Sequence, residues 1–288
     1  MMKAFLYRIF CGFLLGLSIF APGFSGSLIA INMGIYQDLV RIMSNPLKDI
    51  KKNINYCLPL GIGGVVSAIL FVIVFEFLFE TYLRGTILLC IGFIAGNLPI
   101  VMDAIKEHAF KKRYIIGGLV SFTVALVVAL LSINLDALSG NGYYVSHFLV
   151  FAIGGLMAGA VAFMPGMSLS TILMTLGIYG QLIFIASSFL SMDFSHLAHV
   201  VVFGVSTVCG LILASKGIKV LFEKAPGLTN ALVFGFILGS MIGIFIQSLY
   251  IEDANFNWIF GSIMLIVGLL MSILFVKLGK NINKAIPS

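Results

Sequence analysis

One stretch of this chain occurs twice, and the repetition limits the folds that the chain can adopt. Residues 22–39 read PGFSGSLIAINMGIYQDL, and residues 165–182 read PGMSLSTILMTLGIYGQL. Every identical residue recurs at the same offset of 143 positions (165 − 22 = 143), which is almost half of the 288 residues. The chain is therefore predicted to contain two tandem copies of one unit, residues 1–143 and residues 144–288.

The same offset relates residues well outside the two copies. The matches are glycines before the motif and two short segments after it: Gly12 and Gly16 with Gly155 and Gly159, LFE at 78–80 with LFE at 221–223, and GFIAG at 92–96 with GFILG at 235–239. A chance similarity between two glycine-rich turns would not keep one register over such a length. The N-terminal segment reads like a secretory signal peptide, but its counterpart lies in the middle of the chain, so we expect it to remain attached.

The composition indicates an integral membrane protein built from helices. Sixty per cent of the residues are hydrophobic and ten per cent are charged, whereas a soluble domain has about a quarter charged. The mean hydropathy is +1.14, and the apolar runs suit helices of about 20 residues and lack the period-two alternation of an outer-membrane barrel. The basic residues behind the net charge of +6 lie between apolar segments, where they orient helices, so nucleic acid is not an expected partner.

No metal, cofactor or catalytic site is predicted. The four cysteines lie within or beside apolar segments without CxxC or other metal-type spacing, so they are expected to be small core residues. The histidines fall in loops or at segment ends, where we expect them to be solvated. No His, Asp or Cys constellation accompanies the repeated motif, so an intramembrane enzyme such as a lipid phosphatase is the weakest functional alternative.

Each half is predicted to contain five apolar segments. They run roughly over residues 4–21, 23–44, 57–79, 86–105 and 114–134, and over 145–164, 166–187, 197–215, 229–250 and 257–277. Only the Pro-Gly motif separates the first two segments of each half, so each pair forms either two membrane spans or one re-entrant helix hairpin. Both alternatives leave three further transmembrane helices in each half.

The distribution of Lys and Arg predicts the orientation of these segments. Cations mark the regions expected in the cytoplasm: Lys3 and Arg8, and residues 41–52, 106–113, 216–224 and 277–284. The opposite loops carry no cation except Arg84. Both termini are therefore expected in the cytoplasm, and each half crosses the membrane an odd number of times, so the second repeat is inverted. Inverted repeats are typical of secondary transporters with a binding site near the middle of the membrane.

The repeated motif is suited to binding an anion inside the membrane. Pro-Gly ends one helix, and the first N–H groups of the next helix have no intrahelical acceptors. That end carries partial positive charge, and serine hydroxyls add donors, so a phosphate can be held without a buried Lys or Arg. The predicted substrate-binding residues are Gly23, Ser25, Gly26 and Ser27 in the first copy and Gly166, Ser168 and Ser170 in the second. For one copy alone, helix capping or close helix packing would explain these residues, but two opposed copies favour the anion site.

Other polar residues near the membrane have two interpretations each. Arg84 is predicted as an outer contact for the phosphate, and Glu76 or Glu80 as a group that couples transport to protons. The alternative is that these side chains extend to the membrane surface, with a Glu80–Arg84 pair if the helix continues. Tyr36 and Tyr179, in the GIY of each copy, are expected to anchor helices at the interface, with a headgroup contact as the alternative.

The doubled pattern of PGFSGS and PGMSLS, each followed by GIY, resembles the PopT-type polyprenyl-phosphate transporters of bacteria over essentially the whole chain. The resemblance implies a flippase of the bacterial cytoplasmic membrane that returns undecaprenyl phosphate, the carrier lipid of cell-wall synthesis, from the outer to the inner leaflet. It implies polyprenyl phosphate and membrane lipid as partners, and no cofactor. A homodimer is one alternative that the sequence leaves open. The family favours Gly after the motif serine, as at Gly26, whereas the second copy has Leu169, so the first hairpin is the preferred phosphate site.

A small-anion channel or exchanger is the alternative function. Opposed helix ends would serve an inorganic anion as well as a lipid phosphate. A lateral opening to lipid would favour lipid transport, whereas a continuous aqueous pore would favour the channel.

Overall fold

The computed structural model describes the chain apart from residues 1, 24–25, 45–47, 108–110, 133–147, 162–166, 252, 254–255 and 286–288. The described residues form helices joined by short turns, and no strand occurs among them. In chain order the helices are α1 (Met2–Phe20), α2 (Gly26–Asn32), α3 (Tyr36–Ser44), α4 (Ile50–Thr81), α5 (Leu83–Ala95), α6 (Leu98–Lys106), α7 (Lys112–Leu131), α8 (Phe148–Val161), α9 (Leu169–Thr175), α10 (Tyr179–Leu190), α11 (Leu197–Lys224), α12 (Pro226–Leu249) and α13 (Trp258–Ala285). The prediction of an all-helical protein is confirmed.

Several of these helices are long and apolar enough to cross a membrane. Within the described residues there are six such spans: α4, α5 together with α6, α7, the first part of α11, α12, and the first part of α13. A seventh results if the bent pair of α9 and α10 counts as one span. The protein is therefore a multi-pass membrane protein. Among the described residues the full-length spans are fewer than the apolar segments, because the described helices around the two motifs are short or broken.

Large apolar side chains cover the outside of the bundle. On α7 the exposed residues include Ile116, Leu119 and Val124, and α11 and α13 carry similar rows. The buried set, in contrast, includes polar side chains such as those of Ser168 and Gln247. This distribution suits a protein whose surrounding solvent is hydrocarbon rather than water.

The second apolar segment of each half is broken at the glycine of GIY. Gly34 and Gly177 both adopt left-handed backbone conformations, with φ of 68° and 71°. Each turn is closed by the amide of the following isoleucine, which donates at 3.0 Å to the carbonyl of Ala30 in the first half and of Leu173 in the second. The bend between α9 and α10 is 113°. The continuous apolar arms expected at residues 23–44 and 166–187 are thus each two helices.

The offset of 143 residues also relates the bounds of the helices in the two halves. The matching bounds are Gly26 with Leu169, Asn32 with Thr175, Tyr36 with Tyr179, Thr81 with Lys224, and Leu83 with Pro226. The duplicated sequence therefore adopts the same local structure in both halves, with helix breaks at equivalent positions.

The junction between α4 and α5 is repeated between α11 and α12. The hydroxyl of Thr86 donates to the carbonyl of Leu78 at 2.8 Å, and the hydroxyl of Thr229 donates to the carbonyl of Leu221 at 3.1 Å. Both threonines are buried. Each of these carbonyls also accepts the backbone amide of the capping residue, Tyr82 or Ala225, so the hydroxyl adds a second hydrogen bond that joins the two helices at the break.

Glycines bring helices within each half into backbone contact. α1 packs on α4, where a Cβ added to Gly12 would lie 2.0 Å from the carbonyl oxygen of Leu60. α8 packs on α11 in the same manner, where a Cβ added to Gly155 would lie 2.5 Å from the carbonyl oxygen of Phe203. No side chain fits at either glycine, which is the usual reason for small residues between membrane helices.

Two further helix pairs join one half of the chain to the other. α5 of the first half packs on α13 of the second, and α7 of the first packs on α12 of the second. A Cβ added to Gly235 of α12 would lie 2.0 Å from the carbonyl oxygen of Gly118 of α7, so these two backbones cross at glycines. The halves are therefore interlocked, and α5 is buried along most of its length.

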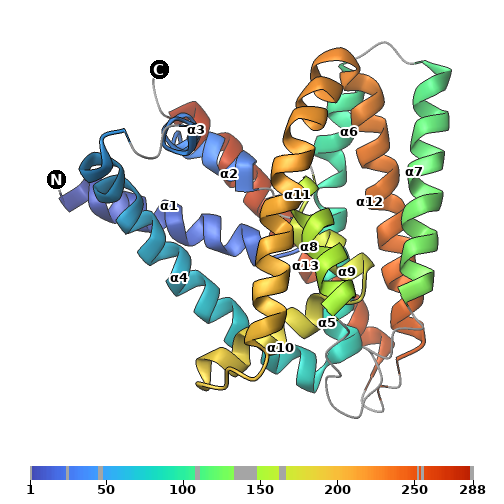
Figure 1. Ribbon diagram of the computed structural model, residues 1–288. Coiled ribbons are helices and arrows are strands. Elements are labelled where there is room, and N and C mark those ends of the chain that lie inside the picture. The colour runs from blue at the N-terminus through green and yellow to red at the C-terminus, as the bar shows by residue number, and fades with distance from the viewer. Residues whose placement is uncertain are drawn as a thin grey trace.

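The two motif hairpins occupy different environments. Figure 1 shows α2 and α3 beside α1 and α4 on one side of the molecule, with α8 and α9 near its centre and α6, α7 and α12 on the opposite side. The main hydrophobic core includes residues of α4, α5, α9, α10 and α12. A smaller cluster lies under the first hairpin and contains Cys11, Ala30, Met33, Ile35, Tyr56 and Leu60. The hairpin of α9 and α10 is thus central, whereas that of α2 and α3 is peripheral.

Candidate functional site

The second motif places a pair of serine hydroxyls at the start of α9. Ser168 precedes the helix in an extended conformation, with φ −116° and ψ 138°. Its hydroxyl makes no capping bond to the helix and lies instead 2.7 Å from the hydroxyl of Ser170. Both residues are buried. Capping therefore does not account for Ser168, and the first turn of α9 presents two adjacent hydroxyls to its surroundings.

Polar side chains surround the same hairpin within the core. Thr171, Thr175 and Gln181 are buried on α9 and α10. Gln247 of α12 donates from Nε2 to the carbonyl of Thr175 at 3.4 Å and to that of Ala129 on α7 at 2.5 Å. A buried amide that binds two helix carbonyls fixes α9 between α7 and α12. The region around the second motif is therefore both polar and held in place.

The first motif brings its backbone against α5. Gly23 has φ +85°, and a Cβ there would lie 2.7 Å from the carbonyl oxygen of Phe93. A Cβ on Gly26 would lie 2.9 Å from the hydroxyl oxygen of Ser18. The backbone contact requires glycine at position 23, whereas the neighbour of Gly26 is a serine hydroxyl that can rotate away. Among the other predicted residues, Ser25 and Gly166 lie outside the described residues, and Ser27 lies in the first turn of α2.

The two GIY tyrosines differ in environment despite their equivalent sequence positions. Tyr36 is 40% exposed, whereas Tyr179 is 4% exposed. The hydroxyl of Tyr179 donates to the carbonyl of Phe20 at 2.6 Å, at the end of α1 and just before the first Pro-Gly break. The expectation that Tyr179 anchors a helix at the membrane interface is therefore wrong, because its ring and hydroxyl are both used inside the protein.

This hydrogen bond lies beside a row of aromatic rings on α4. The ring of Phe79 meets Tyr179 edge-on with centroids 5.9 Å apart, and the ring of Phe71 stacks on Phe20 at 5.7 Å. Phe75 lies between them on α4 and stacks on Phe71 at 3.9 Å. The second hairpin and the first helix break are thus packed against the same face of α4, and the two motifs are neighbours in the fold.

Glu76 connects α4 to the second hairpin. The hydroxyl of Ser187 on α10 donates to Oε1 of Glu76, and Ser187 is buried while Glu76 is half-buried. Glu80, one turn further along, is exposed. Of the two predicted coupling carboxylates, Glu76 is therefore the one with a hydrogen bond to the second hairpin.

Arg84 binds the end of α12. Its Nε donates to the carbonyl of Ser248 at 2.8 Å, and its Nη2 donates to the carbonyls of Leu249, at 3.2 Å, and Ile251. Its guanidinium also lies 4.7 Å from the ring centroid of Phe256. A cation at a helix C-terminus binds carbonyls that lack intrahelical donors and stabilises the helix dipole. Arg84 thus joins the two halves, and its predicted contact with phosphate stays a prediction.

The Glu80–Arg84 pair depended on a continuous helix, and the helix is not continuous. α4 ends at Thr81, and Tyr82 has φ −139° before α5 begins at Leu83. The two side chains therefore do not share one helix face. The structure gives the arginine a different partner, the last turn of α12.

The histidines near the start of α11 are not simply solvated. The ring of His199 stacks on Phe148 with centroids 4.2 Å apart and lies 5.7 Å from the ring of His196. Nearby, the backbone amide of Ser195 donates to Oδ1 of Asp193 at 2.9 Å and lowers the pKa of that carboxyl. The part of the chain that the structure describes contains no group of three or more potential metal ligands.

Sequence reasoning missed Ser187 and Gln247. Both are polar residues inside long apolar segments, which is the signal that could have singled them out. Their partners, Glu76 and Thr175, lie far away in the chain, so the contacts themselves required the structure.

Comparison with known proteins gives matches that extend over both halves of this chain. The family described as undecaprenyl phosphate translocase-like matches residues 1–112 and 51–257, two overlapping ranges that contain both motifs. A polyprenyl-phosphate transporter of Staphylococcus aureus (strain NCTC 8325 / PS 47) is 24% identical over 242 residues, which cover 83% of this chain and 85% of the relative. No solved structure gives a significant match. The resemblance carried by the doubled motif is thereby confirmed, and the chain belongs to the undecaprenyl phosphate translocase-like family.

Proposed function

We propose that this protein is a transporter that returns undecaprenyl phosphate from the outer to the inner leaflet of the bacterial cytoplasmic membrane. The family and the relative from S. aureus support polyprenyl phosphate as the substrate. The structural observation that carries the proposal is the buried hydroxyl pair of Ser168 and Ser170 at a helix break within an apolar bundle. A phosphate needs such donors during transfer, because an isolated charge in apolar surroundings is strongly unfavourable.

The phosphate is bound by the two motifs together. Gly23, Ser25, Gly26 and Ser27 contribute from the first copy, and Gly166, Ser168 and Ser170 from the second. The hydroxyls of the second copy bond to each other, and a phosphate oxygen would replace this neutral bond with charge-assisted bonds about twice as strong. Leu169 packs against the main core, so the second copy accommodates the larger side chain, and both hairpins are included in the site.

The second half is inverted relative to the first, and transport proceeds by movement of one unit against the other. The pairing of α5 with α13 and of α7 with α12 supports this arrangement. The offset of 143 residues relates α5 to α12 and α7 to α13. If each helix is replaced by its counterpart in the other half, the α5–α13 pair becomes the α12–α7 pair, as a two-fold axis between the halves requires. With the cation-rich loops inside, both termini lie in the cytoplasm, and the two motifs approach the middle of the membrane from opposite sides.

Glu76 is the group that couples transport to protons. Its carboxylate accepts the hydroxyl of Ser187, so its charge state determines how α4 and the second hairpin are joined. Protonation turns the carboxylate from an acceptor into a group that also donates, and the contact with Ser187 then reorganises. Glu80 is less suited to this role because it is exposed and lies away from the hairpin contact.

The proposal is tested with the full-length protein in lipid vesicles. A short-chain polyprenyl phosphate is placed in the outer leaflet, and its disappearance from that leaflet is followed with an added phosphatase that cannot enter the vesicles. We expect the protein to move the lipid to the inner leaflet, so that the fraction open to the phosphatase falls with time. We expect no accompanying flux of chloride or inorganic phosphate. Flux of either ion without movement of the lipid would contradict the proposal and favour a small-anion channel or exchanger.

A further inference from the structure

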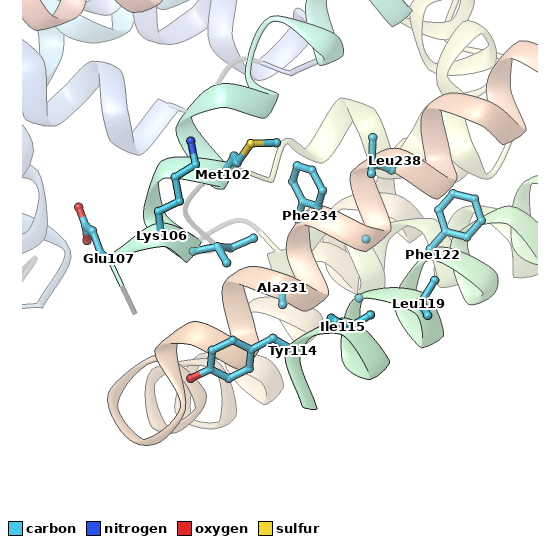
Figure 2. Close-up of a pocket in the computed structure, with 13 residues that line it drawn as sticks. Met102, Lys106, Glu107, Tyr114, Ile115, Leu119, Phe122, Ala231, Phe234 and Leu238 are labelled. Carbon is cyan, nitrogen blue, oxygen red and sulfur yellow. The ribbon is translucent and has the colours of Figure 1, made fainter. Parts of the chain in front are cut away.

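A pocket lies between α6, α7 and α12, outside the residues of the two motifs. Its volume is about 750 Å³. Figure 2 shows Tyr114 and Lys106 toward one end and Leu119, Phe122 and Leu238 along the rest. The pocket therefore has a polar end and an apolar shaft, which is the shape of binding site that a lipid with a charged headgroup requires.

The pocket opens sideways to the membrane. Ile115 and Leu119 line it and are 48% and 59% exposed. Gly118 and Gly235 also line it, at the point where the backbones of α7 and α12 cross. The glycines bring the two backbones into contact, so the crossing forms the floor of the pocket. A hydrocarbon chain can enter from the bilayer and lie along this floor.

The polar end is suited to a phosphate. The guanidinium of Arg113 lies 5.5 Å from the ring centroid of Tyr114, which holds this cation beside the pocket. Lys106 lies 3.7 Å from Asp103, but both side chains are mostly exposed, so this ion pair is weak and the ammonium is available to an anion. Glu107 also lines this end, and Figure 2 shows its carboxylate on the side of α6 away from α7 and α12.

We propose that this pocket binds the hydrocarbon chain of the transported lipid at the cytoplasmic end of its path, with the phosphate at Lys106 and Arg113. The inference rests on the proposed function and adds the place where the tail lies. Apolar side chains of α7 and α12 suit the hydrocarbon chain, and the two cations suit the phosphate monoester of the transported lipid. It is built from both halves of the chain, so movement of one half against the other would reshape it.

The experiment is photo-crosslinking of the full-length protein in lipid nanodiscs. The probe is a polyprenyl phosphate with a photoreactive group on its chain, and the crosslinked residues are mapped by mass spectrometry. We expect adducts on α7 and α12 within the pocket, and competition by unlabelled polyprenyl phosphate but not by an equal excess of phosphatidylglycerol. Adducts elsewhere, or equal competition by phosphatidylglycerol, would overturn the inference.

Matched tryptophan substitutions on α7 test the pocket directly. Ile115→Trp places a large ring in the pocket, whereas Ile116→Trp, at the neighbouring exposed residue, does not line it. The ring fills space that the bound chain would occupy, and the displaced part of the chain returns to lipid that is as apolar as the pocket. We therefore expect Ile115→Trp to lower crosslinking within the pocket and Ile116→Trp to leave it unchanged. Equal effects of the two variants would contradict the inference.

Charge substitutions test the polar end in the same assay. Lys106→Gln with Arg113→Gln is expected to weaken competition by polyprenyl phosphate, whereas Lys111→Gln, at an exposed residue that does not line the pocket, is not. Equal competition in both variants would contradict the proposed position of the phosphate at this end of the pocket. Because crosslinking needs no transport, pocket binding in a protein that moves no lipid would refute only the proposed function. Transport without adducts in the pocket would refute only this inference.

Discussion

The hydroxyl of Tyr179 donates to the carbonyl of Phe20 at 2.6 Å, so the second hairpin is joined to the last turn of α1, just before the first Pro-Gly break. Tyr179 is buried, and the carbonyl that it satisfies belongs to a helix end that lacks intrahelical donors. The two copies of the motif are therefore not separate sites on a scaffold. The second copy takes part in the structure that precedes the first.

Loss of this hydrogen bond should destabilise the protein. Tyr179→Phe keeps the ring and leaves the Phe20 carbonyl without its donor, so we expect a loss of about 1–3 kcal/mol in the free energy of unfolding. The equivalent variant Tyr36→Phe changes a side chain that is 40% exposed, so we expect it to stay within about 0.5 kcal/mol of the wild type. Unfolding in detergent measures both. Equal effects would mean that the Tyr179 hydroxyl is not used as described.

Gly23→Ala should destabilise the first motif. A non-glycine residue at φ +85° costs about 1–2 kcal/mol, and the new Cβ would also lie 2.7 Å from the carbonyl oxygen of Phe93. Gly204→Ala is the control, because a Cβ there meets no atom within 4 Å and alanine favours a helix. We expect a lower unfolding temperature for Gly23→Ala and an unchanged or higher one for Gly204→Ala. The reverse order would contradict the described backbone at the first break.

Arg84→Lys should loosen the end of α12. A lysine ammonium cannot reproduce the planar fork that binds the carbonyls of Ser248, Leu249 and Ile251. We expect faster hydrogen exchange in the last turn of α12 and a loss of about 2 kcal/mol in stability. Arg41→Lys, at an exposed arginine paired with a neighbour on its own helix, should change neither.

The same variants separate the two roles considered for Arg84. If Arg84→Lys exchanges and unfolds like the wild type but transports lipid poorly, then the guanidinium acts on the phosphate rather than on α12. If Arg84→Lys lowers stability and speeds hydrogen exchange in α12, the role of the guanidinium is structural.

Glu76→Gln should remove the proton dependence of transport. The amide keeps an oxygen that accepts the Ser187 hydroxyl, but it cannot take up and release a proton as a carboxylate does. We expect the part of lipid transport that responds to an imposed pH gradient to be lost while lipid binding is retained. Glu80→Gln should leave both unchanged because Glu80 is exposed. A gradient response that survives in Glu76→Gln would exclude this residue as the coupling group.

Much of the fold could be predicted from the sequence because membrane helices leave a direct signal in the pattern of apolar residues. The all-helical architecture follows from that pattern, and the repeated offset already relates residues that become equivalent helix ends. The breaks at Gly34 and Gly177 were not predicted, because the apolar runs continue through them without a proline or a charge. The positive φ of a single glycine is enough to bend such a run.

The site could be predicted only where local sequence determines local structure. The serines of the second motif lie at a helix start, as the Pro-Gly pattern indicates. The burial of Tyr179 and the contact of Glu76 with Ser187 depend instead on how α4 packs against the second hairpin. Identical GIY segments gave one exposed and one buried tyrosine, so tertiary packing decides the role of each.

The central claim is that the motif serines hold the phosphate during transfer. It is tested most directly by polyprenyl-phosphate transport in vesicles that contain the wild type, Ser168→Ala with Ser170→Ala, or Ser25→Ala with Ser27→Ala. Thr123→Ala, at an exposed residue of α7, is the control. Loss of a hydrogen bond to a charged acceptor costs about 1.5–3 kcal/mol, so each motif variant should transport at least about tenfold more slowly while it remains folded. Transport at the wild-type rate in both motif variants would contradict the account.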